Sequence, residues 1–246
     1  MQRYFLEEAI DDRKIKIRGD DAKHISRVMR MEPGDAVICC GPDGRCAKCS
    51  LEKVATEEVT ASVVEFLREK AELPVSVTVA QGLPKKDKLE LIVQKGTELG
   101  ADRFLPFQAE RSIVKWDRKK SDKKRERLRK IAKEAAEQSH RSRIPEVESP
   151  VAFQDLLSAV GVYDVKILAY EEEAKAGEAS RFARLLGDMK PGQSLIVIIG
   201  PEGGLSKREV DLLEKQGCVS CGLGPRILRT ETAALYTLSA VSYQFE

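Results

Sequence analysis

The 246-residue sequence lacks a long hydrophobic run. Its longest uninterrupted aliphatic stretch is Leu195–Ile199, which is far short of the roughly 18 apolar residues that a membrane-spanning helix needs. The N-terminus also lacks the apolar core of a signal peptide, because it turns acidic at Glu7 and Glu8. These absences predict a soluble, cytoplasmic protein that makes no membrane contact.

The sequence has little that could bind a metal. Its six cysteines include two C-x-x-C pairs, Cys46/Cys49 and Cys218/Cys221, and four thiolates can hold zinc tetrahedrally. The pairs lie far apart in the chain, however, and lack the glycine- and aromatic-rich surroundings of a zinc knuckle. The sequence therefore favours free, buried thiols and no metal site. Disulfides are not expected in a cytosolic chain.

Apolar material, in contrast, is plentiful. Hydrophobic residues make up 42% of the chain and charged residues 33%, which excludes disorder over its whole length. The net charge is only +2, but residues 115–143 hold 13 lysines and arginines against 5 acidic residues, a local charge of +8. The rest of the chain then carries −6. One concentrated basic segment is typical of a polyanion contact, and a solvated helix face is the alternative.

Residues 1–70 are expected to form a small barrel of short strands. Lys14–Arg18 and, less cleanly, Ala36–Cys39 alternate with the period of a strand, and Gly41–Gly44 is typical of a hairpin tip. Residues 20–31 are predicted to form a short helix. The three-residue spacing of its basic side chains places them along one side of that helix, where they could form a basic face with the N-terminal arginine. An ordinary exposed helix is the alternative. These residues are Arg3, His24, Arg27 and Arg30.

After a polar connector at 69–74, strands alternate with helices. This order predicts an α/β domain with a mainly parallel sheet covered on both faces. Strands are expected at 75–80, 103–107, 165–170, 195–199 and 218–223, and helices at 87–99, 121–139, 178–186, 207–216 and 230–245.

Three strand ends of this sheet are candidate binding loops, because ligands of parallel sheets bind beyond the carboxyl ends of the strands. They are Leu168–Glu171, Ile199–Leu205 and Leu223–Ala233. The second loop has three glycines and leads into Ser206–Glu209, an S-x-x-E capping box. It matches neither the dinucleotide-binding nor the phosphate-loop motif. Tight strand-to-helix turns without a ligand are the alternative.

Ile199–Ser206 and Leu223–Ala233 closely resemble the SPOUT class of RNA methyltransferases, and within it the bacterial 16S ribosomal RNA uridine-N3 methyltransferase family. Residues 24–35 resemble the PUA-like domain of that family, and further motifs match at 95–100, 110–112 and 137–141. The resemblance covers the whole chain. It implies a PUA-like RNA-binding domain at 1–70 and a methyltransferase domain at 74–246 with a C-terminal trefoil knot, a rare exception to unknotted chains.

The resemblance also implies partners and site residues. The cofactor is expected to be S-adenosylmethionine, the substrate 16S rRNA of the small ribosomal subunit, and the assembly a homodimer. The residues expected to hold the cofactor are Leu168, Gly200, Glu202, Gly203, Leu223, Gly224, Ile227, Leu228, Thr232 and Ala233. The residues expected to contact RNA are Arg3, His24, Arg27, Arg30, Lys95, Arg111, Gln138, Arg141 and Arg143.

For catalysis, the acceptor nitrogen of uridine must lose a proton, and the anion spreads onto two carbonyl oxygens. A guanidinium beside those oxygens stabilises the anion, which makes Arg229 and Arg226 candidates. Glu231 could position an arginine or accept the proton. A salt bridge from either arginine to Glu202 or Glu231 is the alternative reading of these side chains.

Two other functions remain open at this stage. One is a SPOUT enzyme that methylates a ribose hydroxyl or tRNA, against which the PUA-like domain and the full-length match argue. The other is a non-catalytic RNA-binding or ribosome-assembly factor, against which the intact cofactor loops argue.

Overall fold

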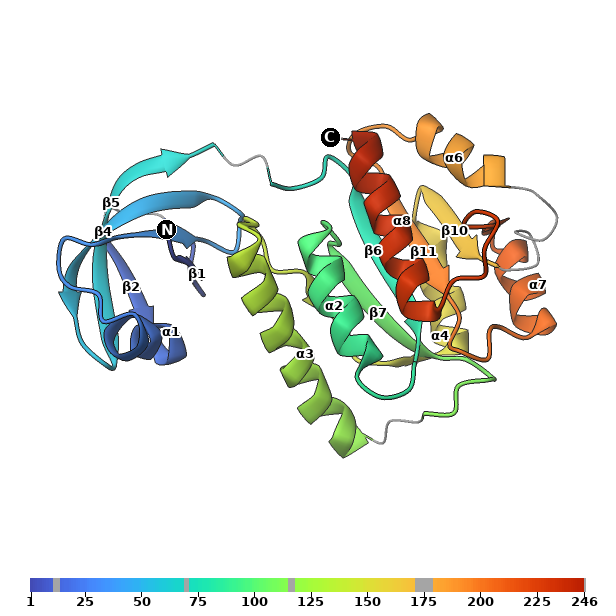
Figure 1. Ribbon diagram of the computed structural model, residues 1–246, viewed down its shortest axis with the longest axis horizontal. Coiled ribbons are helices and arrows are strands. Elements are labelled where there is room, and N and C mark those ends of the chain that lie inside the picture. Colours follow the sequence, from blue (N-terminus) through green and yellow to red (C-terminus); the bar gives the residue numbers. More distant parts are fainter. Residues whose placement is uncertain (11–13, 69–70, 115–117, 171–178, 246) are drawn as a thin grey trace. The chain divides into compact units, whose positions relative to one another are not determined.

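The computed structural model describes residues 1–10, 14–68, 71–114, 118–170 and 179–245, and its chain forms two compact units (Figure 1). The N-terminal unit comprises Met1–Glu72 and Ala136–Ile144, and the C-terminal unit comprises Leu73–Ala135 and Pro145–Glu246. The chain therefore passes between the units three times. The expected boundary at 70–74 corresponds to the first passage, whereas the return of residues 136–144 to the N-terminal unit was not foreseen.

The N-terminal unit is built on a curled five-stranded sheet with the strand order β1-β3-β4-β5-β2. Alternating residues such as Ile15 and Ile17 enter its core, as the period-two pattern predicts. The strands predicted at 14–18 and 36–39 are confirmed, and the predicted hairpin tip connects β3 to β4. The bounds are β1 (Arg3–Phe5), β2 (Lys14–Arg18), β3 (Ala36–Cys40), β4 (Cys46–Val54) and β5 (Glu58–Leu67).

The helix predicted at 20–31 is only partly an α-helix. Helix α1 (Gly19–Lys23) continues as a π-helix, η1 (His24–Val28), and Arg30 follows it with a φ of +51°. A π-helix has more residues per turn than an α-helix, so a spacing of three no longer places side chains in one row. The prediction that His24, Arg27 and Arg30 lie along one side of a helix is therefore wrong.

The cysteines give a second correction. Cys40 and Cys46 form a disulfide, because the β3–β4 register pairs them directly and brings their Cα atoms to 4.1 Å. The other four cysteines are free and buried, as predicted for that part of the set. Among the described residues, no three or more His, Cys, Asp or Glu side chains gather as a metal site.

The C-terminal unit contains a seven-stranded sheet with the order β12-β10-β11-β6-β7-β8, and β9 also pairs with β7. Every recorded pairing in it is parallel, as predicted. The bounds are β6 (Ser76–Gly82), β7 (Arg103–Gln108), β8 (Glu146–Val147), β9 (Val151–Ala152), β10 (Val165–Ala169), β11 (Ser194–Ile199) and β12 (Val219–Cys221).

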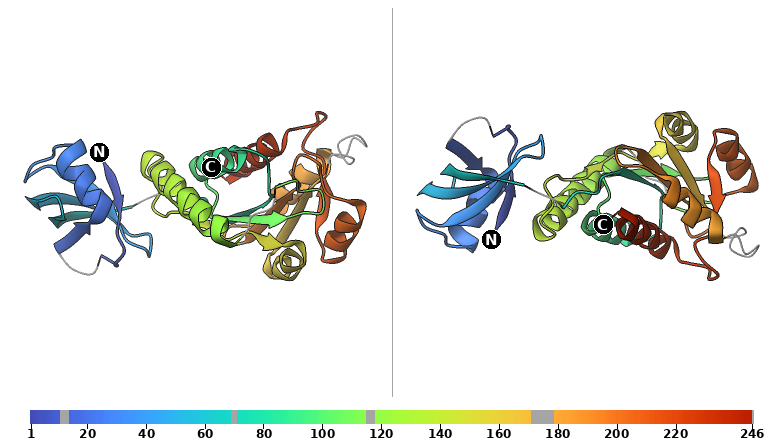
Figure 2. Two further views of the ribbon diagram at one scale, coloured as in Figure 1. Left: turned by 90° about the horizontal axis from the view of Figure 1, so that it is seen from below. Right: turned by 90° about the horizontal axis from the view of Figure 1, so that it is seen from above.

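Helices cover both faces of this sheet (Figure 2). In the central strand β11, Leu195 and Val197 pack into the core on the side of α2 and α8, while Ile196 and Ile198 pack on the side of α4 and α7. Burial on both faces explains why this strand is a continuous aliphatic run. The helices are α2 (Lys88–Glu98), α3 (Arg118–Gln138), α4 (Phe153–Ala159) with the 3-10 turn η2 (Val160–Val162), α6 (Ala179–Asp188), α7 (Lys207–Lys215) and α8 (Thr230–Phe245).

Within the described part of the chain, no helix is both long and apolar enough to cross a bilayer.

Candidate cofactor and active site

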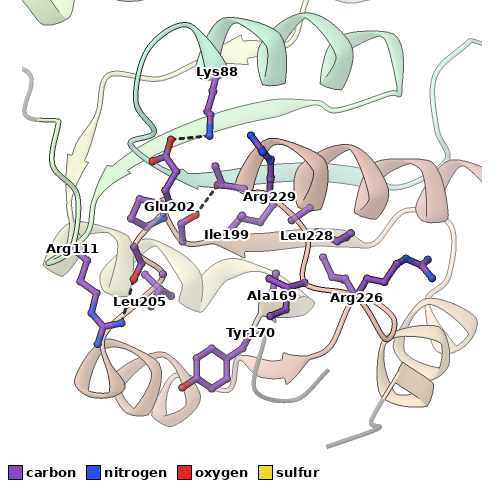
Figure 3. Close-up of a pocket in the computed structure, with 18 of the residues that line it drawn as sticks. Lys88, Arg111, Ala169, Tyr170, Ile199, Glu202, Leu205, Arg226, Leu228 and Arg229 are labelled. Carbon is purple, nitrogen blue, oxygen red and sulfur yellow. Dashed lines mark hydrogen bonds and ion pairs between the residues drawn. The ribbon is translucent and has the colours of Figure 1, made fainter. Parts of the chain in front are cut away.

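A cavity of about 670 Å³ lies at the carboxyl ends of β10, β11 and β12 (Figure 3). The three strand ends that the sequence singled out therefore meet at one place, as expected for a parallel sheet. Glu171, which the sequence analysis included in the first loop, lies outside the described residues. The lining consists of Lys88, Arg111, Ala169, Tyr170, Ile199–Leu205, Lys207, Leu223, Arg226–Thr230 and Ala233.

Most of the residues predicted to hold a cofactor line this cavity. They are Gly200, Glu202, Gly203, Leu223, Ile227, Leu228 and Ala233. Three others do not. Leu168 is fully buried in the core on the α4 and α7 side, and its neighbours Ala169 and Tyr170 line the cavity instead. Gly224 adopts a φ of +86° and so shapes the turn, while Thr232 is exposed on α8.

The glycine-rich loop after β11 ends in the capping box that the sequence predicted. Ser206 Oγ accepts a hydrogen bond from the Glu209 backbone N–H, and Glu209 Oε2 accepts one of 2.8 Å from the Ser206 N–H. The same buried carboxylate accepts a bond of 2.8 Å from the backbone N–H of Glu110. These contacts fix where the loop ends and α7 begins.

Thr230 joins two cavity-lining segments to the end of β6. Its hydroxyl donates to the Gly200 carbonyl at 2.7 Å and accepts from Gln81 Nε2 at 2.7 Å. The start of α8 is thereby tied to the end of β6 and to the loop after β11. A Cβ at Gly200 would lie 3.1 Å from the Gly204 carbonyl carbon, so a side chain there would require the neighbouring backbone to shift by a few tenths of an ångström.

The two arginines of the cavity do not form the salt bridges that the sequence offered as an alternative to a catalytic role. Arg226 and Arg229 are exposed, and their side chains make no ion pair or hydrogen bond with any residue that the structure describes (Figure 3). The salt bridges proposed from these arginines to Glu202 or Glu231 are not formed. Instead, Lys88 Nζ lies 3.0 Å from Glu202 Oε1 and 3.1 Å from Glu231 Oε2.

We call Lys88, Glu202 and Glu231 the carboxylate clamp. Hydrogen bonds from the Lys88 ammonium to Glu202 and Glu231 raise the pKa of Lys88 above its ordinary value. Burial alone would raise the pKa of Glu202, but hydrogen bonds from Lys88 and from backbone N–H groups, including that of Lys85, outweigh it and leave this pKa below its usual range. Lys88 and Glu202 therefore both carry charge at neutral pH.

The residues predicted to contact RNA divide into exposed and engaged groups. Arg27, Arg30, Gln138 and Arg143 are exposed. Arg111 is also exposed, but it lines the cavity and donates to the Gly203 carbonyl at 3.2 Å.

The side chains of the engaged group interact inside their own unit. His24 Nδ1 lies 3.0 Å from the Tyr4 hydroxyl, and Lys95 pairs with Glu98 at 2.8 Å.

Arg3 and Arg141 are the two predicted RNA contacts that lie in the interior. Arg3 is 4% exposed and donates to the Arg141 carbonyl at 2.8 Å, while Arg141 is 3% exposed and pairs with Glu72. Burial of this extent argues against direct contact with a phosphate. The sequence alone could not show that Arg141 is buried, because its burial depends on Glu72 lying nearby in the fold.

Further residues line the cavity that were not among the expected cofactor contacts, although most of them lie in the three candidate loops. They are Lys88, Ala169, Tyr170, Ile199, Pro201, Gly204, Leu205, Lys207 and Thr230. Several of these adjoin residues that were selected. Lys88 had no such signal, because it comes from a helix that precedes all three candidate loops by 80 positions or more.

Comparison with known proteins agrees with this architecture. Residues 71–242 match the model of the RNA methyltransferase domain, and residues 17–64 match that of the RNA methyltransferase PUA domain. An α/β unit with a loop-lined cavity, joined to a PUA domain, therefore defines an RNA methyltransferase.

Within that class, the chain belongs to the family of ribosomal RNA small subunit methyltransferase E, as its resemblance predicted. The Bacillus subtilis protein of that name is 53% identical, over 100% of this chain and 98% of its own length. The Mycobacterium tuberculosis protein is 36% identical, over 92% of this chain and 84% of its own.

Solved structures extend the comparison to bound cofactor. A Neisseria gonorrhoeae ribosomal RNA small subunit methyltransferase E bound to S-adenosylmethionine superposes with a TM-score of 0.84 at 25% identity, covering 99% of this chain and 97% of its own. A putative methyltransferase from Legionella pneumophila in complex with the same cofactor gives 0.81 at 30% identity, covering 98% and 96%.

Proposed function

We propose that this protein transfers a methyl group from S-adenosylmethionine to N3 of a uridine in the 16S rRNA of the small ribosomal subunit. The observation that carries the proposal is the cavity at the ends of β10, β11 and β12, which combines glycine-rich backbone with Arg226 and Arg229, two arginines whose side chains have no partner among the described residues. The names and bound cofactor of the relatives support the substrate class and the methyl donor.

The residues present fit S-adenosylmethionine, which when bound supplies a methyl group carried on a positively charged sulfonium. The cavity volume of about 670 Å³ lies within the usual range for small-molecule sites. Apolar Ile199, Leu223 and Leu228 offer surface for a ring, and the glycine-rich backbone of Gly200–Gly204 lines the cavity. Within that segment, the Gly200 and Gly203 carbonyls already accept hydrogen bonds from Thr230 and Arg111.

The two exposed arginines serve the acceptor base in this proposal. Arg229, with Arg226, places a guanidinium beside the carbonyl oxygens of the uracil and stabilises the anion left when N3 loses its proton. Glu231 is not itself among the residues that line the cavity, but its partner Lys88 and its neighbour Thr230 are, and on this adjacency we assign Glu231 the role of proton acceptor. The N3 electron pair then forms the new N–CH₃ bond, and the electrons of the broken S–CH₃ bond remain on sulfur.

RNA binding is assigned to the exposed basic side chains. Arg27, Arg30, Arg111 and Arg143 can reach phosphates, with Gln138 as a neutral contact. We propose Arg3 and Arg141 as structural residues of the N-terminal unit, because both are buried.

We further propose that the protein is a cytoplasmic homodimer with a trefoil knot in the C-terminal unit. The knot is supported by the resemblance and by the meeting of loops 200–205 and 224–229 at one cavity. Exposed Leu91 on α2 and Tyr243 on α8, the latter 89% exposed, are candidates for the subunit contact.

Sedimentation tests this contact. Leu91→Lys with Tyr243→Lys is expected to convert a dimer into a monomer, because charge at an apolar contact is costly to bury. Val162→Lys, which alters a side chain that is 82% exposed on η2, is the control and should sediment as the native protein does. A native protein that is already monomeric would reject the dimer.

The deciding experiment measures methyl transfer from labelled S-adenosylmethionine to three substrates: small subunits lacking the modification, naked 16S rRNA, and bulk tRNA. Label recovered as 3-methyluridine from the small subunit or its rRNA is the expected result. Transfer to tRNA or to a ribose hydroxyl would replace the substrate in this proposal. Absence of cofactor binding would favour a non-catalytic RNA-binding factor.

A further inference from the structure

We propose that Lys88 is a positioning residue for methyl transfer: its ammonium group holds the Glu231 carboxylate beside the cavity, where it can take the proton of the acceptor base. The inference rests on the function proposed above and deepens it. It assigns a role to helix α2, which contributes neither a glycine-rich loop nor an arginine to the site.

The geometry of the carboxylate clamp carries the argument. Lys88 Nζ contacts one oxygen of Glu202 and one oxygen of Glu231, at 3.0 and 3.1 Å. The Lys88 side chain is 25% exposed, and those of Glu202 and Glu231 are 27% and 15% exposed, so solvent screens these charges only in part. The backbone N–H of Lys85 also donates to Glu202 at 3.1 Å and anchors that carboxylate from a second side.

The clamp joins three segments that are far apart in the sequence. Lys88 is the first residue of α2, Glu202 belongs to the loop after β11, and Glu231 lies in the first turn of α8. Glu231 follows Arg229 by two residues, so a contact that fixes Glu231 also limits where the chain of Arg229 can go.

The location of Lys88 is itself unfavourable for a helix. The N-terminus of a helix carries partial positive charge and disfavours a cation there, typically by about 0.3–1 kcal/mol. Glu202 and Glu231 supply the opposite charge that makes this position tolerable. Helix stability therefore does not account for a lysine at this position, whereas its ion pairs with two carboxylates of the site do.

Other charged groups lie near the clamp, but none of those described forms an ion pair with Glu202 or Glu231. Lys86 and Asp87 precede it on its own segment, Arg111 and Lys207 line the cavity, and Arg229 approaches from the start of α8. Among the described ion pairs, Lys207 pairs with Asp211, and Lys88 alone pairs with Glu202 and Glu231. Removing Lys88 would leave two carboxylates close together with no cation between them.

The proton transfer from the base to Glu231 explains why the charge of Lys88 matters. N3 of the base gives its proton to the Glu231 carboxylate as the N–CH₃ bond forms, so Glu231 must be ionised beforehand. Two neighbouring carboxylates without a cation repel each other, and one of them then holds its proton to a higher pH.

The test compares Lys88→Met with Lys88→Arg in methyl-transfer assays from pH 5.5 to 9. Lys88→Met should move the acidic limb of the rate profile upward by about one pH unit, which makes the variant up to about tenfold slower than the native protein on that limb. Lys88→Arg keeps the charge and should retain the native profile. Lys215→Met, an exposed lysine at the end of α7, is the matched control.

Two further measurements separate positioning from a merely structural role. Glu202→Gln added to Lys88→Met removes the carboxylate repulsion and should return the acidic limb toward the native pH. Calorimetry should give an S-adenosylmethionine affinity for Lys88→Met within about threefold of the native value.

The inference is overturned if Lys88→Met keeps the native pH profile, or if it is slowed equally at every pH and Lys88→Arg does not restore it. Failure of the native protein to form 3-methyluridine would instead reject the proposed function, and so is distinguishable from failure of this inference.

Discussion

At the residue scale, the site contains two kinds of cation. Arg226 and Arg229 have exposed side chains with no partner among the described residues, whereas Lys88 is fixed between Glu202 and Glu231. An unpaired guanidinium can adapt to a ligand, while a paired ammonium orders its neighbours. The arginines are therefore suited to touch the substrate, and the lysine to hold the site in place.

Arg229→Ala should reduce methyl transfer about 100-fold or more, as loss of one group that stabilises an oxyanion does in other enzymes. The affinity for S-adenosylmethionine should change by less than about threefold, because the cofactor contacts are assigned to loop backbone and apolar side chains. Initial rates and calorimetry measure the two effects. An equal loss of both would make Arg229 a cofactor-binding residue.

At the element scale, the β3–β4 hairpin is closed by the Cys40–Cys46 disulfide, and Arg3 Nη1 lies 3.3 Å from Cys40 Sγ. Arg143 donates to the Asp43 carbonyl at the tip of the same hairpin. The disulfide thus constrains a tip that also contacts one of the exposed basic residues assigned to RNA.

Reduction of this disulfide should lower the free energy of unfolding by about 2 kcal/mol, the loop-entropy value for so short a loop. Urea unfolding with and without a thiol reductant measures it. The Cys40→Ser/Cys46→Ser variant is the control and should be insensitive to reductant. An identical unfolding midpoint for the native protein under both conditions would contradict the prediction.

At the scale of the whole molecule, the return of residues 136–144 to the N-terminal unit is held by Glu72. Its carboxylate pairs with buried Arg141 and accepts a bond of 2.8 Å from the Ser142 backbone N–H. Burial alone would raise the pKa of Glu72, but the Arg141 charge and these hydrogen bonds leave it below its ordinary value.

Glu72→Gln should destabilise the protein by about 3 kcal/mol at pH 7, because it leaves the Arg141 charge buried without its counter-ion. Since the folded-state pKa is depressed, this stabilisation is complete above the ordinary pKa of about 4.5 and is lost as the pH falls through the folded value. Unfolding at pH 7 and pH 3.5 should therefore show a difference that shrinks in acid. Exposed Glu52→Gln is the control, and a difference independent of pH would contradict the assignment.

The sequence predicted what depends on local signals. The aliphatic β11, the loops after β11 and β12, and the Ser206 capping box follow from runs of a few residues, and the structure contains all of them. The resemblance supplied the family, which composition and spacing could not. Leu168 was predicted to hold the cofactor but faces the core, and the sequence could not show this because β10 is covered on both faces.

Features that depend on distant pairing were missed. The Cys40–Cys46 disulfide follows from strand register, and the burial of Arg141 follows from the approach of Glu72. The π-helix at His24–Val28 has no compositional signature that separates it from an α-helix. The short helix α4 lacked a cap hydrogen bond or a long apolar pattern, and no helix was predicted there.

The three passages of the chain between its units have a consequence for dissection of the protein. A fragment cut after Glu72 would lose Arg141 and leave its own carboxylate without a counter-ion, while the remaining fragment would carry residues 136–144 as an unpartnered excursion. Neither piece would be a complete folding unit. Exchange of the RNA-binding part between relatives therefore requires two coordinated replacements, and recombination at a single junction is expected to yield unstable hybrids.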